Sequence, residues 1–210
     1  MRRLPALFRL TLVFVLLLPA VASFTRALAD ETAGAAPPPK EKAILSSAPE
    51  FSGPAVVGGK SCKLSDLLKH GPVLLDFWAT WCVPCLEELP HLQKIWLKYQ
   101  DRGFNLVGVA CDDPKTAAKI KPLIQSKGLK FINIADVDHK IRNMYNIRNF
   151  PTSILIGTDG RIVSISQGYR PGDEAHIDKA IAGLLEGAES GAAGDSSSAQ
   201  PASGAPGGSR

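Results

Sequence analysis

Long apolar runs are absent from the 210-residue sequence after about residue 22. A membrane-spanning helix needs roughly 20 consecutive apolar residues, so no further span is predicted beyond that point. A strong excess of one charge is missing as well. Residues 1–29 hold four Arg and no acid, which leaves 24 − 4 = 20 basic residues against 20 acidic ones. Without a basic patch, the sequence does not predict nucleic-acid binding.

Histidine and cysteine are also scarce, with four of each. Cys82 and Cys85 form one closely spaced pair, but neither Cys62 nor Cys111 has a second cysteine at the spacing of a zinc knuckle. A four-cysteine zinc site normally uses two such pairs. We therefore disfavour a zinc site built from the four cysteines, and we predict neither a metal site nor a bound cofactor.

The apolar run at the start of the chain extends from Leu10 to about Ala22 and follows three arginines. An A-x-A tripeptide ending at Ala29 comes after it, as in a secretory signal peptide. We predict that residues 1–29 are a cleaved signal peptide and that the protein is exported, to the periplasm or another extracytoplasmic space, where disulfides persist. The alternative is an uncleaved membrane anchor, for which the run is short.

Two other segments have the composition of unstructured chain. Residues 30–46 form a Pro/Ala-rich stretch that is predicted to be a flexible linker. Residues 187–210 contain no large apolar residue and are predicted to be a disordered low-complexity tail. Between them, residues 47–186 are about 140 residues, the size of one domain with its own core.

Within this domain, strand and helix patterns alternate along the chain. The expected elements are a hairpin and helical turn over 54–68, strands at 72–79, 104–111 and 130–136, helices at 83–99, 113–128 and 138–145, a pair of strands over 152–166 and a last helix at 173–185. Strands joined by helices and followed by a terminal hairpin predict an α/β sandwich around a mixed β-sheet.

The stretch "FWATWCVPCLEELP" (77–90) holds the closely spaced cysteine pair. Cys82 directly follows a buried strand and begins the next helix, where free backbone N–H groups and the helix dipole favour a thiolate. Cys85 lies one turn further, within reach of the Cys82 sulfur. Pro84 fits the first turn of the helix without losing a hydrogen bond. The pattern favours a redox pair.

The motif "DFWATWCVPC" resembles thioredoxin. The spacing C-x-x-C-x-x-E-x-P, formed by Cys82, Cys85, Glu88 and Pro90, is similar to the exported TlpA/ResA-like branch of that superfamily. So are "KLSDLLKHGPVLLDFW" and "MYNIRNFPTSILIGTDGRIV". The resemblance implies a thioredoxin-like fold with an N-terminal β-hairpin extension, and thiol–disulfide oxidoreductase activity.

The resemblance also implies roles for particular residues. Cys82 matches the nucleophile and Cys85 the resolving cysteine of a redox-active disulfide. Asp76 matches a buried acid beneath them that would transfer a proton to and from Cys85. An ordinary strand carboxylate is the alternative for Asp76.

On the opposite side of the dithiol, Pro151 matches the cis-proline of the superfamily. Trp81, Phe150 and Pro151 would line the surface on which an extended substrate strand lies. Phe150 departs from the smaller residue that is usual before this proline, so a narrower groove is expected.

The direction of electron flow follows from what surrounds Cys82. No histidine stands between the two cysteines, and Phe150 donates no hydrogen bond, so the thiolate is less stabilised than in oxidising relatives. We therefore predict a protein-disulfide reductase, for example in cytochrome c maturation or copper-site assembly. Its partners would be exported proteins with disulfides and a membrane-embedded thiol electron donor.

Two other functions are kept as alternatives. The protein could oxidise or isomerise disulfides in folding proteins, or it could be a non-catalytic metal-binding or chaperone-like module. A peroxidase is disfavoured, because its attacking cysteine usually stands in a different loop context.

Four further residues are predicted to be structural. Cys111 shares the alternation of the strand before it and should point into the core as a small apolar side chain. Cys62 lies in the predicted hairpin, and we predict no disulfide between the two. Glu87 and Glu88 are expected on the solvated face of the helix, near its favourable N-terminus.

Overall fold

The computed structural model describes residues 46–194, with side chains up to Gly187. The predicted signal peptide, and all but the last residue of the predicted linker, lie outside the described residues. Within the described range, no helix is long and apolar enough to cross a membrane.

Five strands form a mixed sheet in the order β5-β4-β3-β6-β7. Their bounds are β3 (Val73–Trp78), β4 (Asn105–Ala110), β5 (Ile132–Ala135), β6 (Thr152–Ile156) and β7 (Ile162–Gln167). β3 is central: it pairs parallel with β4 and antiparallel with β6, while β4 pairs parallel with β5 and β6 antiparallel with β7. The predicted mixed sheet is therefore confirmed.

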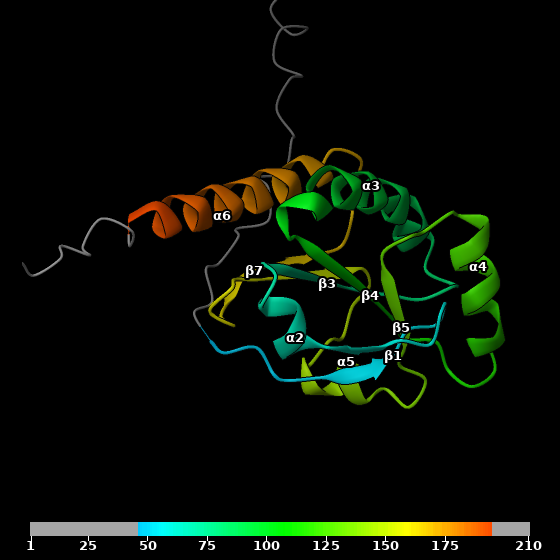
Figure 1. The fold of residues 1–210 in the computed structure, drawn as a ribbon. Helices are drawn as coiled ribbons and strands as arrows, with labels where there is room; N and C mark the ends of the chain where they lie inside the picture. Colours follow the sequence, from blue (N-terminus) through cyan, green and yellow to red (C-terminus); the bar gives the residue numbers. More distant parts are fainter. Residues whose placement is uncertain (1–45, 195–210) are drawn as a thin grey trace, which may run out of the picture. The chain divides into compact units, whose positions relative to one another are not determined.

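Helices cover both faces of this sheet (Figure 1). One face carries α3 (Val83–Tyr99), α4 (Ile120–Ser126) and α6 (Glu174–Gly194), and the other carries α2 (Leu64–Leu68) and α5 (Lys140–Met144). Each face has its own apolar core. The alternating side chains of β3 contribute to both, Leu74 and Trp78 to one and Val73, Leu75 and Phe77 to the other. Every residue of β3 is buried, so the strand is fixed from two sides.

A two-stranded hairpin, β1 (Ser52–Pro54) and β2 (Ser61–Lys63), precedes α2 and confirms the predicted N-terminal extension. It attaches to the outer strand β5 by a bridge between Ala55 and Ile134 and by a 2.8 Å hydrogen bond from the Val56 N–H to the Asn133 carbonyl. The hairpin thereby covers part of an edge whose backbone groups would otherwise be open to pairing with another chain.

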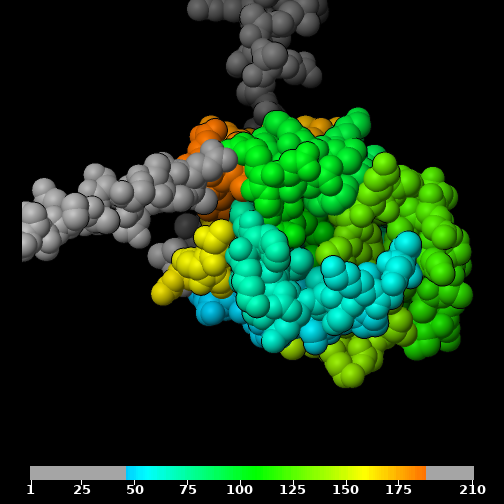
Figure 2. Space-filling view, viewed as in Figure 1, coloured from blue at the N-terminus to red at the C-terminus, as the bar shows by residue number. Residues whose placement is uncertain are grey.

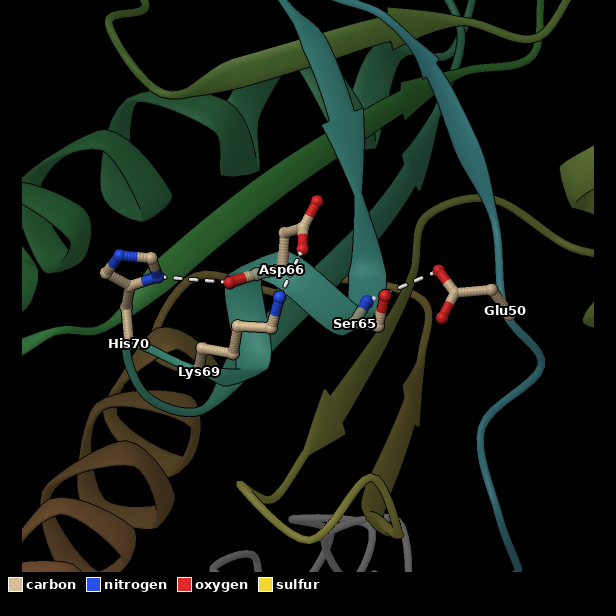
Figure 3. Close-up of polar contacts among 5 residues, drawn as sticks. All are labelled: Glu50, Ser65, Asp66, Lys69 and His70. Atoms are coloured by element: carbon tan, nitrogen blue, oxygen red, sulfur yellow. Dashed lines mark hydrogen bonds and ion pairs between the residues drawn. The ribbon is translucent and has the colours of Figure 1, made fainter.

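Helix α2 begins without a side-chain cap from its own N-cap residue. Instead, the Ser65 N–H donates to Glu50 Oε1 at 3.3 Å, so a residue ahead of the hairpin satisfies one free donor of the helix (Figure 3). Lys69 Nζ donates to Asp66 Oδ1 at 2.7 Å, and His70 Nδ1 lies 3.0 Å from the Asp66 carbonyl oxygen. These last two contacts are exposed and add little to stability.

The helix predicted over 113–128 is shorter than expected. Asp113 does act as a cap, since its Oδ1 accepts from the N–H groups of Lys115 and Thr116 at 2.9 and 3.0 Å. A 3-10 turn, η2 (Ala117–Lys119), follows, and α4 begins only at Ile120. Pro122 explains the delay: it lacks the N–H that a continuous helix needs there, and it fits only the first turn.

Helix α6 differs from the predicted helix at its C-terminal end. α6 continues to Gly194, nine residues past the predicted end at Leu185 and eight residues into the segment predicted as a disordered tail. This stretch holds three alanines but also three glycines, which are poor helix formers, so helix propensity alone does not explain the extension. The remainder of the predicted tail, 195–210, lies outside the described residues.

Gly108 on β4 leaves room for two polar atoms. A Cβ at this position would lie 2.3 Å from Asn133 Oδ1 and 2.9 Å from Trp78 Nε1, closer than real Cβ atoms approach. Both of these polar atoms are buried without a hydrogen-bond partner. Trp78 belongs to β3 and Asn133 to β5. The missing side chain at Gly108, on β4 between them, leaves the space that both side chains occupy.

Gly108→Ala should therefore destabilise the protein by about 1–3 kcal/mol, as overpacking typically does. Gly183→Ala is the matched control: this glycine lies in α6 with nothing within 4 Å of its Cβ position, so alanine should be neutral or stabilise by up to about 1 kcal/mol. Urea unfolding measures both. Equal stability of the two variants would contradict the packing argument.

Candidate active site

Cys82 and Cys85 lie where β3 passes into α3. Cys82 is the N-cap of α3, in an extended backbone conformation, and its Sγ accepts from the Cys85 N–H at 3.3 Å. The two sulfurs form a disulfide with an S–S distance of 2.01 Å. Cys82 is 5% exposed and Cys85 is fully buried, so of the two residues only Cys82 retains exposed surface.

The loop before Cys82 is anchored by Asp112. The Thr80 N–H donates to Asp112 Oδ2 at 3.0 Å, and the Thr80 hydroxyl donates to Oδ1. Asp112 is completely buried and follows β4, the parallel neighbour of β3. Our sequence reasoning did not single out this residue. The signal was present, because carboxyl ends of parallel strands meet at one edge of a sheet and an acidic pair follows this strand.

An apolar surface surrounds the accessible sulfur. Trp81 and Val83 are 58% and 65% exposed on either side of Cys82. The Trp81 ring packs edge-on against Phe150 at 5.8 Å between centroids, and the Phe150–Pro151 peptide bond is cis. The Arg142 guanidinium lies 5.1 Å from the centre of the Phe150 ring. The structure thus brings together the three residues that were predicted to line a substrate surface.

Two buried carboxyl groups, Asp76 and Glu88, lie between β3 and α3. Asp76, 1% exposed in the middle of β3, accepts a 3.1 Å hydrogen bond from the Ser153 hydroxyl through Oδ1. Glu88 in α3 is 2% exposed. Asp76 Oδ2 and Glu88 Oε2 are both buried without a hydrogen-bond partner.

The predicted solvated position of Glu88 is therefore wrong, whereas its neighbour Glu87 is exposed. Glu88 is three residues after Cys85, which places both on the same buried face of α3. The periodicity of that helix contained this signal, and we assigned Glu88 instead by its charge.

Burial controls the ionisation of both groups. Desolvation raises the pKa of Asp76 to about 7, opposed in part by the hydrogen bond from Ser153. Desolvation also raises the pKa of Glu88 to about 9, and the nearby charges of Asp76, Asp173 and Glu174 act in the same direction. Two carboxyls that influence each other titrate as a pair, so the site holds at least one proton at neutral pH.

The other two cysteines stand apart from this chemistry. Cys62 and Cys111 are buried and unpaired, as predicted. Burial raises the pKa of the Cys62 thiol to about 11 and that of Cys111 further still, so both stay protonated and unreactive. Within residues 46–194, no group of three or more His, Cys, Asp or Glu side chains is arranged to hold a metal ion.

A groove of about 660 Å³ lies away from the dithiol, between the β2–α2 segment and the α4–β5 segment. Figure 2 shows this hollow between the two segments. Cys62, Leu67 and Phe131 are among its lining residues. Neither cysteine of the disulfide and neither buried carboxyl lines this groove, so it is separate from the redox site.

Known proteins share this architecture and motif. Residues 44–165 match the model of the AhpC/TSA family. The chain belongs to this family. A crystal structure of a putative thiol:disulfide interchange protein DsbE from Chlorobium tepidum superimposes with a TM-score of 0.62 at 30% identity, covering 68% of this chain and 97% of that one. The predicted thioredoxin-like fold is thereby confirmed.

Sequence relatives agree with this assignment. The thiol-disulfide oxidoreductase ResA of Bacillus anthracis is 37% identical over 105 residues, 50% of this chain and 59% of the relative. ResA of Bacillus subtilis is 33% identical over 110 residues, 52% of this chain and 60% of the relative. The chain thus spans about three fifths of the length of the curated relatives it matches.

The two buried carboxyls make stability depend on pH. Their ordinary pKa values are 3.8 for Asp76 and 4.5 for Glu88, and folding raises both. Between the unfolded and folded pKa values the folded state binds more protons, so stability falls as pH rises. The slope is about 1.4 kcal/mol per pH unit for each group until its folded pKa is passed.

Asp76→Asn should therefore flatten this decline and raise the free energy of unfolding of the disulfide form above that of wild type at neutral and alkaline pH. Glu88→Gln should act in the same direction, and the exposed Glu87→Gln should change little. Urea unfolding at about pH 5, 7 and 9 measures the profile. Parallel profiles for wild type and Asp76→Asn would show that this carboxyl is not desolvated.

Proposed function

We propose that the protein is an exported thiol–disulfide oxidoreductase that reduces disulfides of other proteins. The observation that carries this proposal is the disulfide between Cys82, at the N-terminus of α3, and the fully buried Cys85. Trp81 and Phe150 beside Cys82 offer an apolar surface for an extended substrate segment. The names of the relatives support the same class of reaction.

The reaction would proceed in two exchanges. The Cys82 thiolate of the reduced protein attacks one sulfur of a substrate disulfide, forms a mixed disulfide and releases the other substrate sulfur as a thiolate. Cys85 then loses its proton and attacks the Cys82 sulfur, which releases the second substrate thiolate. Two electrons pass to the substrate, and the Cys82–Cys85 disulfide remains.

The proton of Cys85 requires a nearby acceptor. Cys85 is fully buried, so water does not reach it directly. Asp76 lies on β3, on the face of the sheet that α3 covers, and its raised pKa of about 7 suits a group that takes and returns a proton near neutral pH. We assign this transfer to Asp76. Glu88, with a still higher pKa, stays protonated during the exchange and keeps a second negative charge away from Asp76.

The direction of electron flow rests on how little stabilises the Cys82 thiolate. The Cys85 N–H at the helix N-terminus donates to the Cys82 sulfur, while Val83 and Pro84, between the cysteines, carry no polar side chain. A weakly stabilised thiolate favours the disulfide form and hence donation of electrons. A membrane-embedded thiol donor would then restore the dithiol. Cytochrome c maturation and copper-site assembly are the substrate settings that we infer.

The two cysteines should differ sharply in reactivity. In the reduced protein near neutral pH, iodoacetamide should alkylate Cys82 before Cys85, because Cys82 is the accessible residue at the helix N-terminus. Cys82→Ala should abolish insulin reduction, and Cys85→Ser should accumulate mixed disulfides. Cys62→Ser, at a buried unpaired cysteine, is the control that keeps activity. Alkylation of Cys85 first would reverse the assigned roles, and stoichiometric zinc or copper binding without turnover would favour a metal-binding module.

The reduction potential decides between a reductase and an oxidase or isomerase. We expect a value more negative than about −180 mV, the potential of protein disulfide isomerase. Equilibration with glutathione redox buffers, followed by alkylation and mass measurement, gives the value. A potential near that of the oxidant DsbA, about −120 mV, would overturn the proposed direction.

A further inference from the structure

A row of polar side chains leads from Asp76 to the edge of the sheet. Asp76 on β3 stands opposite Ser153 on β6, and Ser153 stands opposite Ser166 on β7. Residues directly opposite each other on paired strands share one face of the sheet. This face is the one beneath α6 (Figure 1), where the neighbouring residues Leu74 and Leu155 belong to the apolar core. Three polar residues in a line across an apolar face are unusual, because burying polar groups costs free energy.

A small cavity lies along this row. Its volume is about 20 Å³, and its polar lining comes from Ser153, Ser164, Ser166 and His176. One water molecule needs roughly 10–15 Å³ and two or more polar partners, so the cavity meets both requirements. Ser153 is buried, Ser166 is half-buried on the edge strand and His176 is exposed at the start of α6. The lining therefore runs from the interior to solvent.

We propose that the Asp76–Ser153–Ser166 row, completed by one water molecule in this cavity, is the route by which Asp76 exchanges protons with solvent. The inference rests on the proposed role of Asp76 as proton acceptor for Cys85. Ser153 and Ser166 do not touch the reacting sulfurs, so they act as relay residues that position and pass the proton.

Each transfer along the row balances. When Asp76 has taken the proton of Cys85, its carboxyl gives a proton to the Ser153 oxygen while the Ser153 hydroxyl gives its own to the cavity water. The water passes one proton on towards Ser166 and the surface, and every hydroxyl ends with the proton number it began with. The 3.1 Å hydrogen bond between Ser153 and Asp76 is the first link.

Two other titratable groups, Glu88 and Cys111, interact with Asp76. Glu88 on α3 is itself buried, and Asp173 and Glu174 act on Glu88. Cys111, at the end of β4, is a buried thiol whose pKa is raised. On the dithiol side, a bound substrate would cover Cys82. The serine row leads instead to the edge strand β7, where Ser166 is half-buried.

Single-turnover kinetics test the route. The reduced protein is mixed with the aromatic disulfide dithiobisnitrobenzoate, which releases one coloured thiolate on attack by Cys82 and a second on attack by Cys85. Ser153→Ala should leave the first phase unchanged and slow the second by about tenfold or more, within the usual range of proton-transfer effects. Ser153→Thr, which restores the hydroxyl, should recover the wild-type rate.

Two further variants give the comparison its control. Ser166→Ala, at the half-buried edge of the sheet, should also slow the second phase and tests the route even where Ser153→Ala folds poorly. Ser126→Ala, whose hydroxyl only donates to the Leu123 carbonyl in α4, should match wild type. The ratio of the second-phase rate in H₂O to that in D₂O should be larger in the two slowed variants than in wild type. Wild-type second phases in both Ser153→Ala and Ser166→Ala would overturn the proposal.

A readout without catalysis separates the route from the role of Asp76. In the disulfide form at about pH 5, the infrared band of the protonated Asp76 carboxyl is identified by its loss in Asp76→Asn. After transfer to D₂O, this band should shift more slowly in Ser153→Ala than in wild type; equal exchange would reject the route. If Asp76→Asn keeps a wild-type second phase, the proposed proton role of Asp76 fails instead, whatever the exchange rates.

Discussion

Burying a carboxyl group in the central strand is the constraint on which the site depends. Asp76 has paired neighbours on both sides of β3, and each residue of that strand is buried, so its carboxyl group lies in the interior. A shift of the register by one residue would move it to the other face and bring an apolar neighbour to this one. The register that fills both cores therefore also holds Asp76 on the face that α3 covers, and the cost of desolvating its charge raises its pKa.

The same strand sets the difference between the two cysteines. β3 ends at Trp78, and the loop that Asp112 anchors brings Cys82 to the beginning of α3. Because a helix N-terminus presents free N–H groups, the first sulfur lies in a field that favours a thiolate. The second sulfur is one turn inside and belongs to a fully buried residue, on the same buried face of α3 as Glu88. Exposure and acidity of the thiols thus both follow from where strand and helix meet.

Much of this arrangement was predictable from local patterns. The continuous apolar run of β3, the helical spacing of α3 and the turn at Asp159-Gly160 each have a period or a turn chemistry of their own, and these elements were found where we expected them. The start of α4 was missed because Pro122 outweighs the cap at Asp113. Glu88 was wrongly placed on the solvated face because of its charge, and Asp112 was overlooked. Whether a charged side chain is buried depends on elements that pack against it from distant parts of the sequence.

The two buried carboxyls also limit each other. If both were ionised, two unscreened charges would lie in an apolar interior, each raising the cost of the other. When one of the two carboxyls is protonated, this cost is avoided and the pair can still accept a second proton. The Ser153 hydroxyl lowers the pKa of both groups and so favours the charged form of each. Ser153 also stands opposite Ser166 on the edge strand β7. A buried acid pair with one hydroxyl link to an edge strand can hold a proton away from water and still exchange it. Reversible disulfide chemistry at a buried thiol requires both properties.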